Sequence, residues 1–509
     1  MFTLAAALAL AAQEPEAPEP PASDLCALPG EAPAAARAGW AIIEAGEITN
    51  PSDLADALRA APQGQRRVVQ GGSFKDSDMR KVAPLLAGAC LVYTELDGSN
   101  WEGTEIPGLR LVRASMIGAK AARARWPGLS TTGVDLQGAD FTGADLAGLR
   151  FVSSWQGADF AETSFRSANL TGASFACGIT IDVWCINGAP DFAGADLTQA
   201  DISGLWLWEA KNVAGAVLNG TIIAPAAFAY LGEARISGPL RMAKDFTSPY
   251  QTEAGETYQP PVADITADEA RTLIAAVVAE TREDDHPSFD CAKAVARTEK
   301  LICGEYETAL RALDRDLAAV WAAVRAAGKG DLAAQRRWLA TRSTCGDDRT
   351  CLHALYRARI AVLRAKLGPG IALAPGESVT YHEDTFPLPE AMRSGALYQR
   401  ILPVLRDASG QRITLTGKSD GSLAAEGDAL GTNAHMCSLG VEAARFDPKT
   451  GWWSARTEGG VKVPLFRVEG RRIVLRYSGN SGNTPEEAME FIGCGMRASF
   501  DDGIDLEAR

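Results

Sequence analysis

Bulky apolar residues recur every five positions through much of the first half of the chain. In GVDLQGADFTGADLAGLRF, residues 133–151, each unit holds a small residue, an acid and then a large apolar residue. A period of five fits neither the α-helix, near 3.6 residues, nor the β-strand, at 2. A fixed short period instead predicts a solenoid, in which each unit buries its apolar face by stacking on copies of itself.

The period begins at Leu86, slips by one residue near Trp155 and is interrupted by an excursion at 177–190. We expect the central residues to fill the interior, together with the alanines that stand two positions before many of them. Acids recur just before the centre and are expected to point outward as repeat surface, not as a catalytic pair. These acids are Asp135, Asp140, Asp145, Asp159, Asp196 and Asp201.

The units resemble the pentapeptide-repeat family over about residues 84–223, most clearly at 134–208. The resemblance implies a right-handed quadrilateral β-helix with one pentapeptide per side and four per coil. About seven coils at the strand spacing of about 4.8 Å give a rod about 34 Å long. Some cytosolic members use an acidic rod to imitate DNA. Residues 86–223 hold 14 acids and 8 bases, so charge permits this alternative, but export precludes it.

Beyond a polar linker, the apolar spacing changes to that of helices. A helix is expected from Asp268 to about Arg282, and a stripe from Leu310 to Val324 predicts a second that ends at Gly328. Asp331 is expected to cap the next helix, which carries Leu332 and Leu339. A last helix bears Leu352, Tyr356, Leu363 and Leu367. The pattern predicts a small bundle of three long helices and a short leading one.

From about Arg406 the spacing changes again, to short strands separated by Gly, Asp and Asn turns, which predicts a small C-terminal antiparallel β domain. Cys437 and Cys494 are expected to join two of these strands. Trp452 and Trp453 are neighbours and so point to opposite faces of a strand. One is expected in the core, and the other is a candidate for contact with a partner.

The first 12 residues read as a signal peptide, because a short apolar run ends in small residues and precedes an acidic, Pro-rich stretch. With export, an even number of cysteines predicts disulfides in the periplasm or outside the cell. Metal ligation is disfavoured because no Cys-x-x-Cys pair occurs and the four histidines are scattered. The cysteines are Cys26, Cys90, Cys177, Cys185, Cys291, Cys303, Cys345, Cys351, Cys437 and Cys494.

A second resemblance rests on FDCAKAVARTEKLIC, ALD, QRRWLATRSTC and CLHALYRARIAVL, at about residues 287–368. These runs are similar to the LprI-type lysozyme inhibitor domain, which implies a secreted, non-catalytic helical domain with four structural cysteines. Four cysteines allow three pairings. If the second and third helices are antiparallel, Cys303 lies near Cys345, which leaves Cys291 with Cys351. The other motif residues are Asp290, Glu299, Asp314, Gln335, Trp338, Arg342, Tyr356 and Arg359.

Four side chains are candidates for contact with a partner. Trp338 and Arg342 stand at i and i+4 and so share a helix face, where the alternative is a core tryptophan and an arginine that pairs with Asp314. Trp206 and Trp208 flank the inward Leu207, and the alternative is burial under the capping segment APAAFAYLGEARI.

These features predict a multidomain, exported binding protein without a cofactor or catalytic site. The partner is a protein, best specified as lysozyme or another peptidoglycan-cleaving enzyme, and not a nucleic acid. The alternative is an envelope scaffold without inhibitory activity. The expected parts are a signal peptide (1–12), an acidic linker (13–35), an N-terminal cap (36–83), the solenoid with its cap (84–235), a linker with a helix (236–286), the bundle (287–368), a linker (369–405) and the β domain (406–509).

Charge qualifies the inhibitor interpretation. Residues 287–368 hold 15 Lys or Arg and 9 Asp or Glu, a net charge of +6. Since the whole chain carries −14, the remainder carries −20. Lysozymes are commonly cationic, so a basic module slows rather than steers the encounter. A basic module can instead hold anionic envelope polymers or pack against the acidic solenoid.

Overall fold

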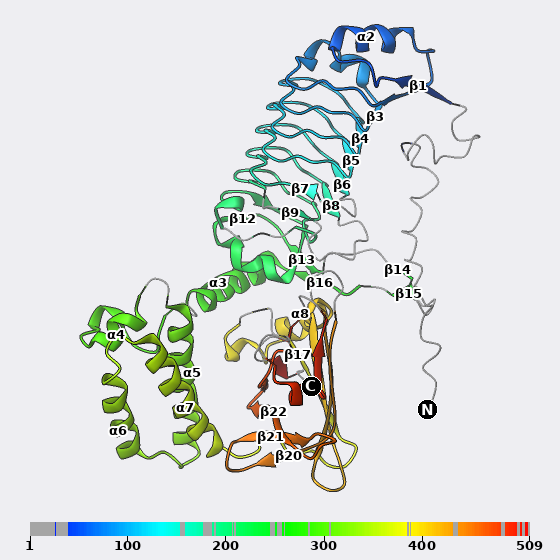
Figure 1. Ribbon diagram of the computed structural model, residues 1–509. Coiled ribbons are helices and arrows are strands. Elements are labelled where there is room, and N and C mark those ends of the chain that lie inside the picture. The colour runs from blue at the N-terminus through cyan, green and yellow to red at the C-terminus, as the bar shows by residue number, and fades with distance from the viewer. Residues whose placement is uncertain are drawn as a thin grey trace, which may run out of the picture.

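Figure 1 shows a computed structural model of the protein. It contains a rod, a helical bundle and an antiparallel sheet. None of the helices in the described part of the chain is long and apolar enough to cross a membrane. The structure describes residues 26, 39–152, 158–176, 186–187, 190–205, 207, 210–244, 250–251, 257–258, 260–283, 286–304, 307–383, 386, 388–430, 436–479, 484–495, 499–500 and 504–506.

Each coil of the rod is 20 residues long where the repeat is uninterrupted. Leu91 pairs with Leu111, Leu111 with Thr131, and Thr131 with Phe151, always in parallel. Four pentapeptides therefore complete one coil, as the resemblance to the pentapeptide-repeat family implied. The strands of this face are β3 (Cys90–Val92), β4 (Arg110–Val112), β5 (Ser130–Thr132), β6 (Arg150–Val152) and β8 (Ser174–Ala176).

The central residues of the pentapeptides fill the rod, which confirms the expected core. All of those described between Leu86 and Leu207 are at most 4% exposed. Their rings contact each other from coil to coil, as between Phe141 and Phe165 at a centroid distance of 5.4 Å. Burying one such side chain contributes about 1.5 to 3 kcal/mol. Trp155 lies outside the described residues.

The corners of the coil need a backbone with positive φ. Gly143, two residues after Phe141, has φ 65°, and the corresponding glycines of other units share this conformation. Side chains rarely adopt it, because the β-carbon approaches the backbone. Arg123 occupies the same position with φ 57°, so the fold accepts some strained corners.

The N-terminal end of the rod is covered by a short helix and two further strands of the same sheet. Cys26 is joined by a disulfide to Cys90 in the first coil. The elements are β1 (Trp40–Glu44), α2 (Pro51–Ala60), β2 (Arg66–Gln70), η1 (Met79–Lys81) and η2 (Ala83–Leu86).

The other end of the rod is closed by the segment expected to cap it and by a helix from far along the chain. Phe228 of η4 (Pro225–Glu233) is fully buried and packs on Phe386 at 5.6 Å. Helix α8 (Ala396–Ala408) adds Ile401 and Val404 to the rod core. Nearby lie η3 (Ala210–Val213), β10 (Val217–Leu218), β11 (Thr221–Ile223), β12 (Arg235–Ile236), β13 (Leu240–Ala243), β16 (Val262–Ile265) and α3 (Ala267–Glu283). Two small strand pairs are β7 (Ala158–Asp159) with β9 (Ile186–Asn187), and β14 (Tyr250–Gln251) with β15 (Thr257–Tyr258).

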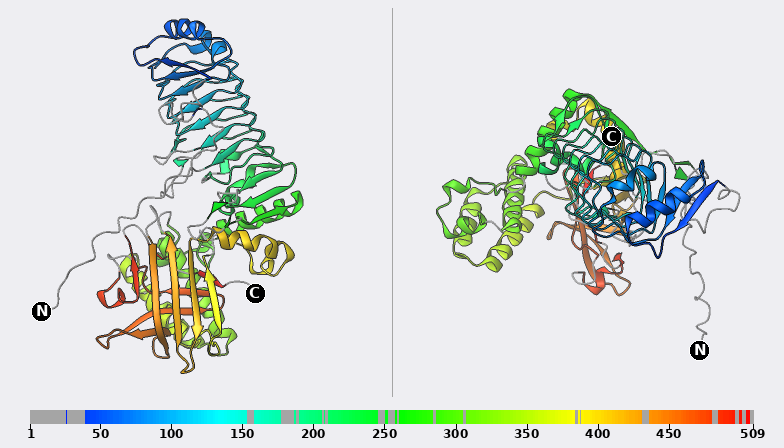
Figure 2. Two further views of the ribbon diagram at one scale, coloured as in Figure 1. Left: turned by 90° about the vertical axis from the view of Figure 1, so that its right-hand side faces the viewer. Right: turned by 90° about the horizontal axis from the view of Figure 1, so that it is seen from above.

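The bundle stands to one side of the rod in Figures 1 and 2. It has the three long helices and the short leading helix that the sequence predicted. Leu310, Val324, Leu352 and Tyr356 are fully buried in its core. Its elements are η5 (Cys291–Lys293), α4 (Arg297–Ile302), α5 (Thr308–Ala326), α6 (Leu332–Ser343) and α7 (Arg349–Ala365).

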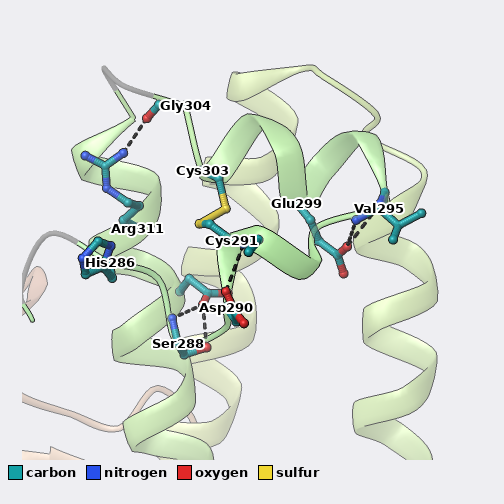
Figure 3. Close-up of a disulfide and its surroundings, with 12 residues drawn as sticks. His286, Ser288, Asp290, Cys291, Val295, Glu299, Cys303, Gly304 and Arg311 are labelled. Atoms are coloured by element: carbon teal, nitrogen blue, oxygen red, sulfur yellow. Dashed lines mark hydrogen bonds between the residues drawn. A yellow bond between two sulfur atoms is a disulfide. The ribbon is translucent and has the colours of Figure 1, made fainter.

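The disulfides of the bundle correct the pairing inferred from antiparallel helices. Cys291 joins Cys303, and Cys345 joins Cys351, with Cα atoms 5.8 and 5.7 Å apart. The inference failed because Cys303 does not begin a long helix. It follows the last residue of the short α4 and faces back toward Cys291 (Figure 3). Each disulfide therefore closes a local loop.

Among the described residues, the C-terminal sheet has nine strands, and the pairing of β19 with β20 brings two non-adjacent strands of its order together. Cys437 and Cys494 are paired in register and joined by a disulfide. The strands, with a short η8 (Glu486–Ala488), are β17 (Ser378–His382), β18 (Gln411–Gly417), β19 (Leu423–Leu430), β20 (Met436–Asp447), β21 (Trp452–Arg456), β22 (Lys462–Glu469), β23 (Arg472–Leu475), β24 (Ile492–Cys494) and β25 (Ile504–Leu506).

Two expectations for this part are wrong. The interval 369–405 is not only a linker, because β17, η6 (Glu390–Met392) and most of α8 lie within it. Its Tyr381 is fully buried in the sheet core. Trp452 and Trp453 are both buried, at 8% and 5% exposure. Trp453 belongs to the core, whereas Arg467 of β22 and Arg476, which directly follows β23, stack over Trp452.

Candidate partner-binding site

The recurrent aspartates of the rod serve its turns. Asp140 accepts a hydrogen bond from the backbone N–H of Thr142 at 2.9 Å, and Asp196 accepts one from Thr198 at 2.9 Å. Such side-chain contacts two residues on stabilise a turn. Asp135, Asp145 and Asp201 make the same contact. The side chain of Asp159 is not among those described.

Two pairs of candidate residues cannot be placed. Trp206 and Trp208 lie outside the described residues, as do Cys177 and Cys185 of the excursion. The inward Leu207 between the two tryptophans is buried, at 1% exposure.

Trp338 and Arg342 share one face of α6, as their spacing predicted, and this face points into the bundle. Arg342 is 8% exposed, and its guanidinium lies 5.9 Å from the Trp338 ring. The Trp338 ring meets Tyr356 edge-on at 5.2 Å. These contacts favour the structural interpretation of both residues.

Arg342 lies in a buried network of charged and polar groups. Its Nη1 donates to the Tyr356 hydroxyl at 2.8 Å, and that hydroxyl donates to Oδ1 of Asp314 at 2.6 Å. Ser288 donates to the other Asp314 oxygen from both its N–H and its hydroxyl. Burial, and then the Asp314 charge, raise the pKa of Tyr356. The hydroxyl therefore remains protonated and bridges the two charges.

Glu299 extends this network to the start of α4. Its carboxylate accepts from the backbone N–H groups of Ala296 and Val295, each at 3.1 Å (Figure 3). It also lies 3.6 Å from Nη2 of Arg342. These backbone donors hold the pKa of Glu299 below its usual value. Asp290 likewise accepts from the N–H of Ala292 at 3.0 Å. The motif residues thus hold the bundle together.

A contact between the bundle and the sheet was not foreseen. Arg364 of α7 pairs with Asp316 of α5 at 2.6 Å and with Glu469 of β22. Arg467 also pairs with Glu469 and lies 4.4 Å from the Trp452 ring. No local pattern in the sequence indicates the pair between Arg364 and Glu469, because the two residues come from different domains.

Two leucines of α6 face solvent, and the sequence pattern did not predict this. Leu332 is 57% exposed and Leu339 is 40% exposed. The position of Trp338 and Arg342 on the inner face could have indicated this, because both leucines lie roughly a quarter turn or more from that face. Within the described residues, no cluster of His, Cys, Asp or Glu could hold a metal ion.

The twenty-residue coil, its inward apolar centres and its positive-φ corners define the rod as a pentapeptide-repeat solenoid. In agreement, residues 110–148 and 153–176 match the family of pentapeptide repeats, in eight copies. No match was found among curated proteins.

Several solved structures are similar to the rod. QnrB1, a plasmid-mediated fluoroquinolone resistance protein, in a trypsin-treated form, is 13% identical over 31% of this chain and 72% of its own, with a TM-score of 0.20. A pentapeptide repeat protein from the Arabidopsis thaliana thylakoid lumen is 26% identical over 23% and 71%, with a TM-score of 0.14. HetL of the cyanobacterium Nostoc, involved in heterocyst differentiation regulation, is 19% identical over 31% and 73%, with a TM-score of 0.14. At such scores these likenesses say nothing about what the chain binds.

Proposed function

We propose that the protein is an exported, non-catalytic binding protein in which the rod presents the helical bundle to a partner protein. The best-specified partner is lysozyme or another peptidoglycan-cleaving enzyme. The observation that supports this proposal is the bundle itself: its four cysteines form two disulfides, and Arg342, Tyr356 and Asp314 form a buried network. These are residues on which the resemblance to the LprI-type domain rests.

The disulfides support an extracytoplasmic location. Four are present among the described residues, and each part of the chain contains at least one. Disulfides form and persist in oxidising compartments and are rare in the cytosol. They also suit a small bundle, because its core alone contributes little stability.

Inhibition of lysozyme tests the proposal directly. The full-length oxidised protein is expected to slow the clearing of a peptidoglycan suspension by lysozyme at micromolar concentration. The matched control is the same protein after reduction and alkylation, which removes the disulfides of the bundle. Clearing at an unchanged rate with the oxidised protein would refute inhibition of that enzyme.

The second candidate is an envelope scaffold without inhibitory activity, and the charge of the bundle favours it. A net charge of +6 repels a cationic lysozyme and attracts anionic envelope polymers. In this case the full-length protein is expected to sediment with purified cell wall at low salt and to be released as salt is raised. Absence from the wall pellet at low salt would contradict the scaffold proposal.

A further inference from the structure

A hydrogen-bonded arginine lies where α6 meets α7 on the surface of the bundle. The Nε and Nη2 groups of Arg359 donate to Oε1 of Gln335 at 3.0 and 2.8 Å. Both side chains are half-buried. The two bonds fix the plane of the guanidinium and leave further N–H groups for another acceptor, since arginine has five.

Aliphatic side chains surround this pair. Leu332 and Leu339 stand three residues before and four after Gln335, so they flank it on α6. On α7, Val362 stands three residues after Arg359 and is 52% exposed. Leu355 stands four residues before Arg359 and is partly buried. We call these four side chains, with Gln335 and Arg359, the α6–α7 face.

The charge at the centre of this face is not matched by an acid. Within the described part of the chain, Arg359 has no ion pair, and its hydrogen-bond acceptor is a neutral amide. Asp331, the N-cap of α6, acts on it only from a distance. Arg336 and Arg337 on α6 are exposed, and neither has an ion pair among the described residues. The α6–α7 face therefore combines exposed aliphatic side chains with a positive charge.

We infer that the α6–α7 face docks a partner segment that presents one carboxylate between aliphatic side chains. The carboxylate accepts from the free N–H groups of Arg359, whose orientation Gln335 fixes, while the aliphatic groups cover Leu332, Leu339 and Val362. Charge-assisted contacts between arginine and carboxylate are the strong kind, and an amphipathic helix is a common occupant of such a face. The inference rests on the proposed function only in taking the bundle as the binding module.

Two other occupants fit this face less well. If a second copy docked through the same face about a two-fold axis, each copy would contribute the same patch to the interface. Arg359 and Arg336 of one copy then approach the same residues of the other, which costs free energy. A lipid surface needs a wider apolar strip than three exposed side chains provide, since interfacial helices bury a whole apolar face.

Two helical peptides test the inference against the full-length oxidised protein. Both carry leucines two turns apart, and a single residue between them is Glu in one peptide and Lys in the other. Calorimetry is expected to show binding of the Glu peptide at least about ten-fold tighter, or about 1.4 kcal/mol. Arg359→Gln is expected to abolish this preference. Arg357→Gln, which removes the same charge from the opposite face of α7, is expected to preserve it.

Leu339→Ser provides a second variant that leaves the core untouched, because the side chain is 40% exposed. It is expected to weaken binding of the Glu peptide, and circular dichroism confirms that each variant is folded. Equal affinity for the two peptides, or equal effects of Arg359→Gln and Arg357→Gln, would overturn the inference. Two further results would also overturn the inference. In the first, the protein binds anionic phospholipid vesicles and Arg359→Gln abolishes that binding instead of peptide binding. In the second, the protein self-associates in the ultracentrifuge and Arg359→Gln abolishes the self-association instead. Lysozyme inhibition is measured separately, so its failure leaves the peptide result intact.

Discussion

The hydroxyl of Tyr356 is expected to stabilise the bundle by bridging two buried charges. Tyr356→Phe removes the bond from Arg342 at 2.8 Å and the bond to Asp314 at 2.6 Å. The two charged groups then remain buried, at 8% and 4% exposure, with 3.7 Å between Nη1 and Oδ1. A hydrogen bond to a charged group contributes about 1.5 to 3 kcal/mol, and the remaining ion pair offsets part of the loss of two. We therefore expect a cost of about 2 to 4 kcal/mol.

Hydrogen exchange measures this cost within the bundle itself. Global unfolding of a multidomain chain does not report on one domain alone. Amides of α5 and α7 are expected to exchange about 30-fold to about 900-fold faster in the variant, the equivalent of about 2 to 4 kcal/mol. Tyr93→Phe is the matched control, because the Tyr93 hydroxyl also accepts from an arginine, Arg113, at 2.9 Å, but the residue is 47% exposed. A change below about 0.5 kcal/mol for Tyr356→Phe, the size expected of a surface substitution, would refute the bridging role.

Further predictions concern the rod, the disulfides and pH. Gly143→Ala is expected to destabilise the rod by about 1 kcal/mol in thermal unfolding, because alanine disfavours φ 65°, whereas Gly46→Ala, where φ is not positive, is not. Peptide mapping without reduction is expected to recover the two local disulfides of the bundle, each worth about 2 to 3 kcal/mol, and a bridge between α4 and the end of α6 would contradict the structure. The pKa of Glu299 is lowered, so its stabilisation is present above the usual value of 4.5 and is lost as pH falls through the lowered value. Glu299→Gln is expected to reduce this acid sensitivity of the bundle, and identical acid unfolding curves would count against it.

The interior of the rod could be predicted from the sequence because the five-residue repeat determines which residue of each unit points inward. A residue five positions on occupies the same place on the next side, so Leu91, Trp126 and Phe165 could be assigned inward without knowing any contact. Helix spacing was nearly as informative in the bundle. It placed Leu310 and Val324 in the core, and Asp331 accepts the capping bond from Ala334 at 2.9 Å.

Contacts between distant segments could not be predicted in this way. The apolar face of α8 shows that the helix packs on something, but not that it packs on the rod. The disulfides of the bundle depended on where α4 ends, which spacing does not fix. One of Trp452 and Trp453 was expected to be a candidate for contact, because strand alternation points neighbours to opposite faces, and the one outside the core is Trp452. Its outer face is instead covered by Arg467 and Arg476, whose stacking has no short-range signature.

Because α8 helps to cover one end of the rod, the rod is completed late in the synthesis of the chain. Coils and the capping segment η4 can add one after another as the N-terminal half emerges, but the cover of the last coil is completed only when the chain has grown to about residue 408, some 180 residues after Phe228. Until then the apolar residues at this end of the rod, Phe228 among them, lack the side chains of α8 that cover them in the folded protein. A premature stop within the bundle therefore yields a rod with an uncovered apolar end, so truncation favours aggregation over simple loss of a domain.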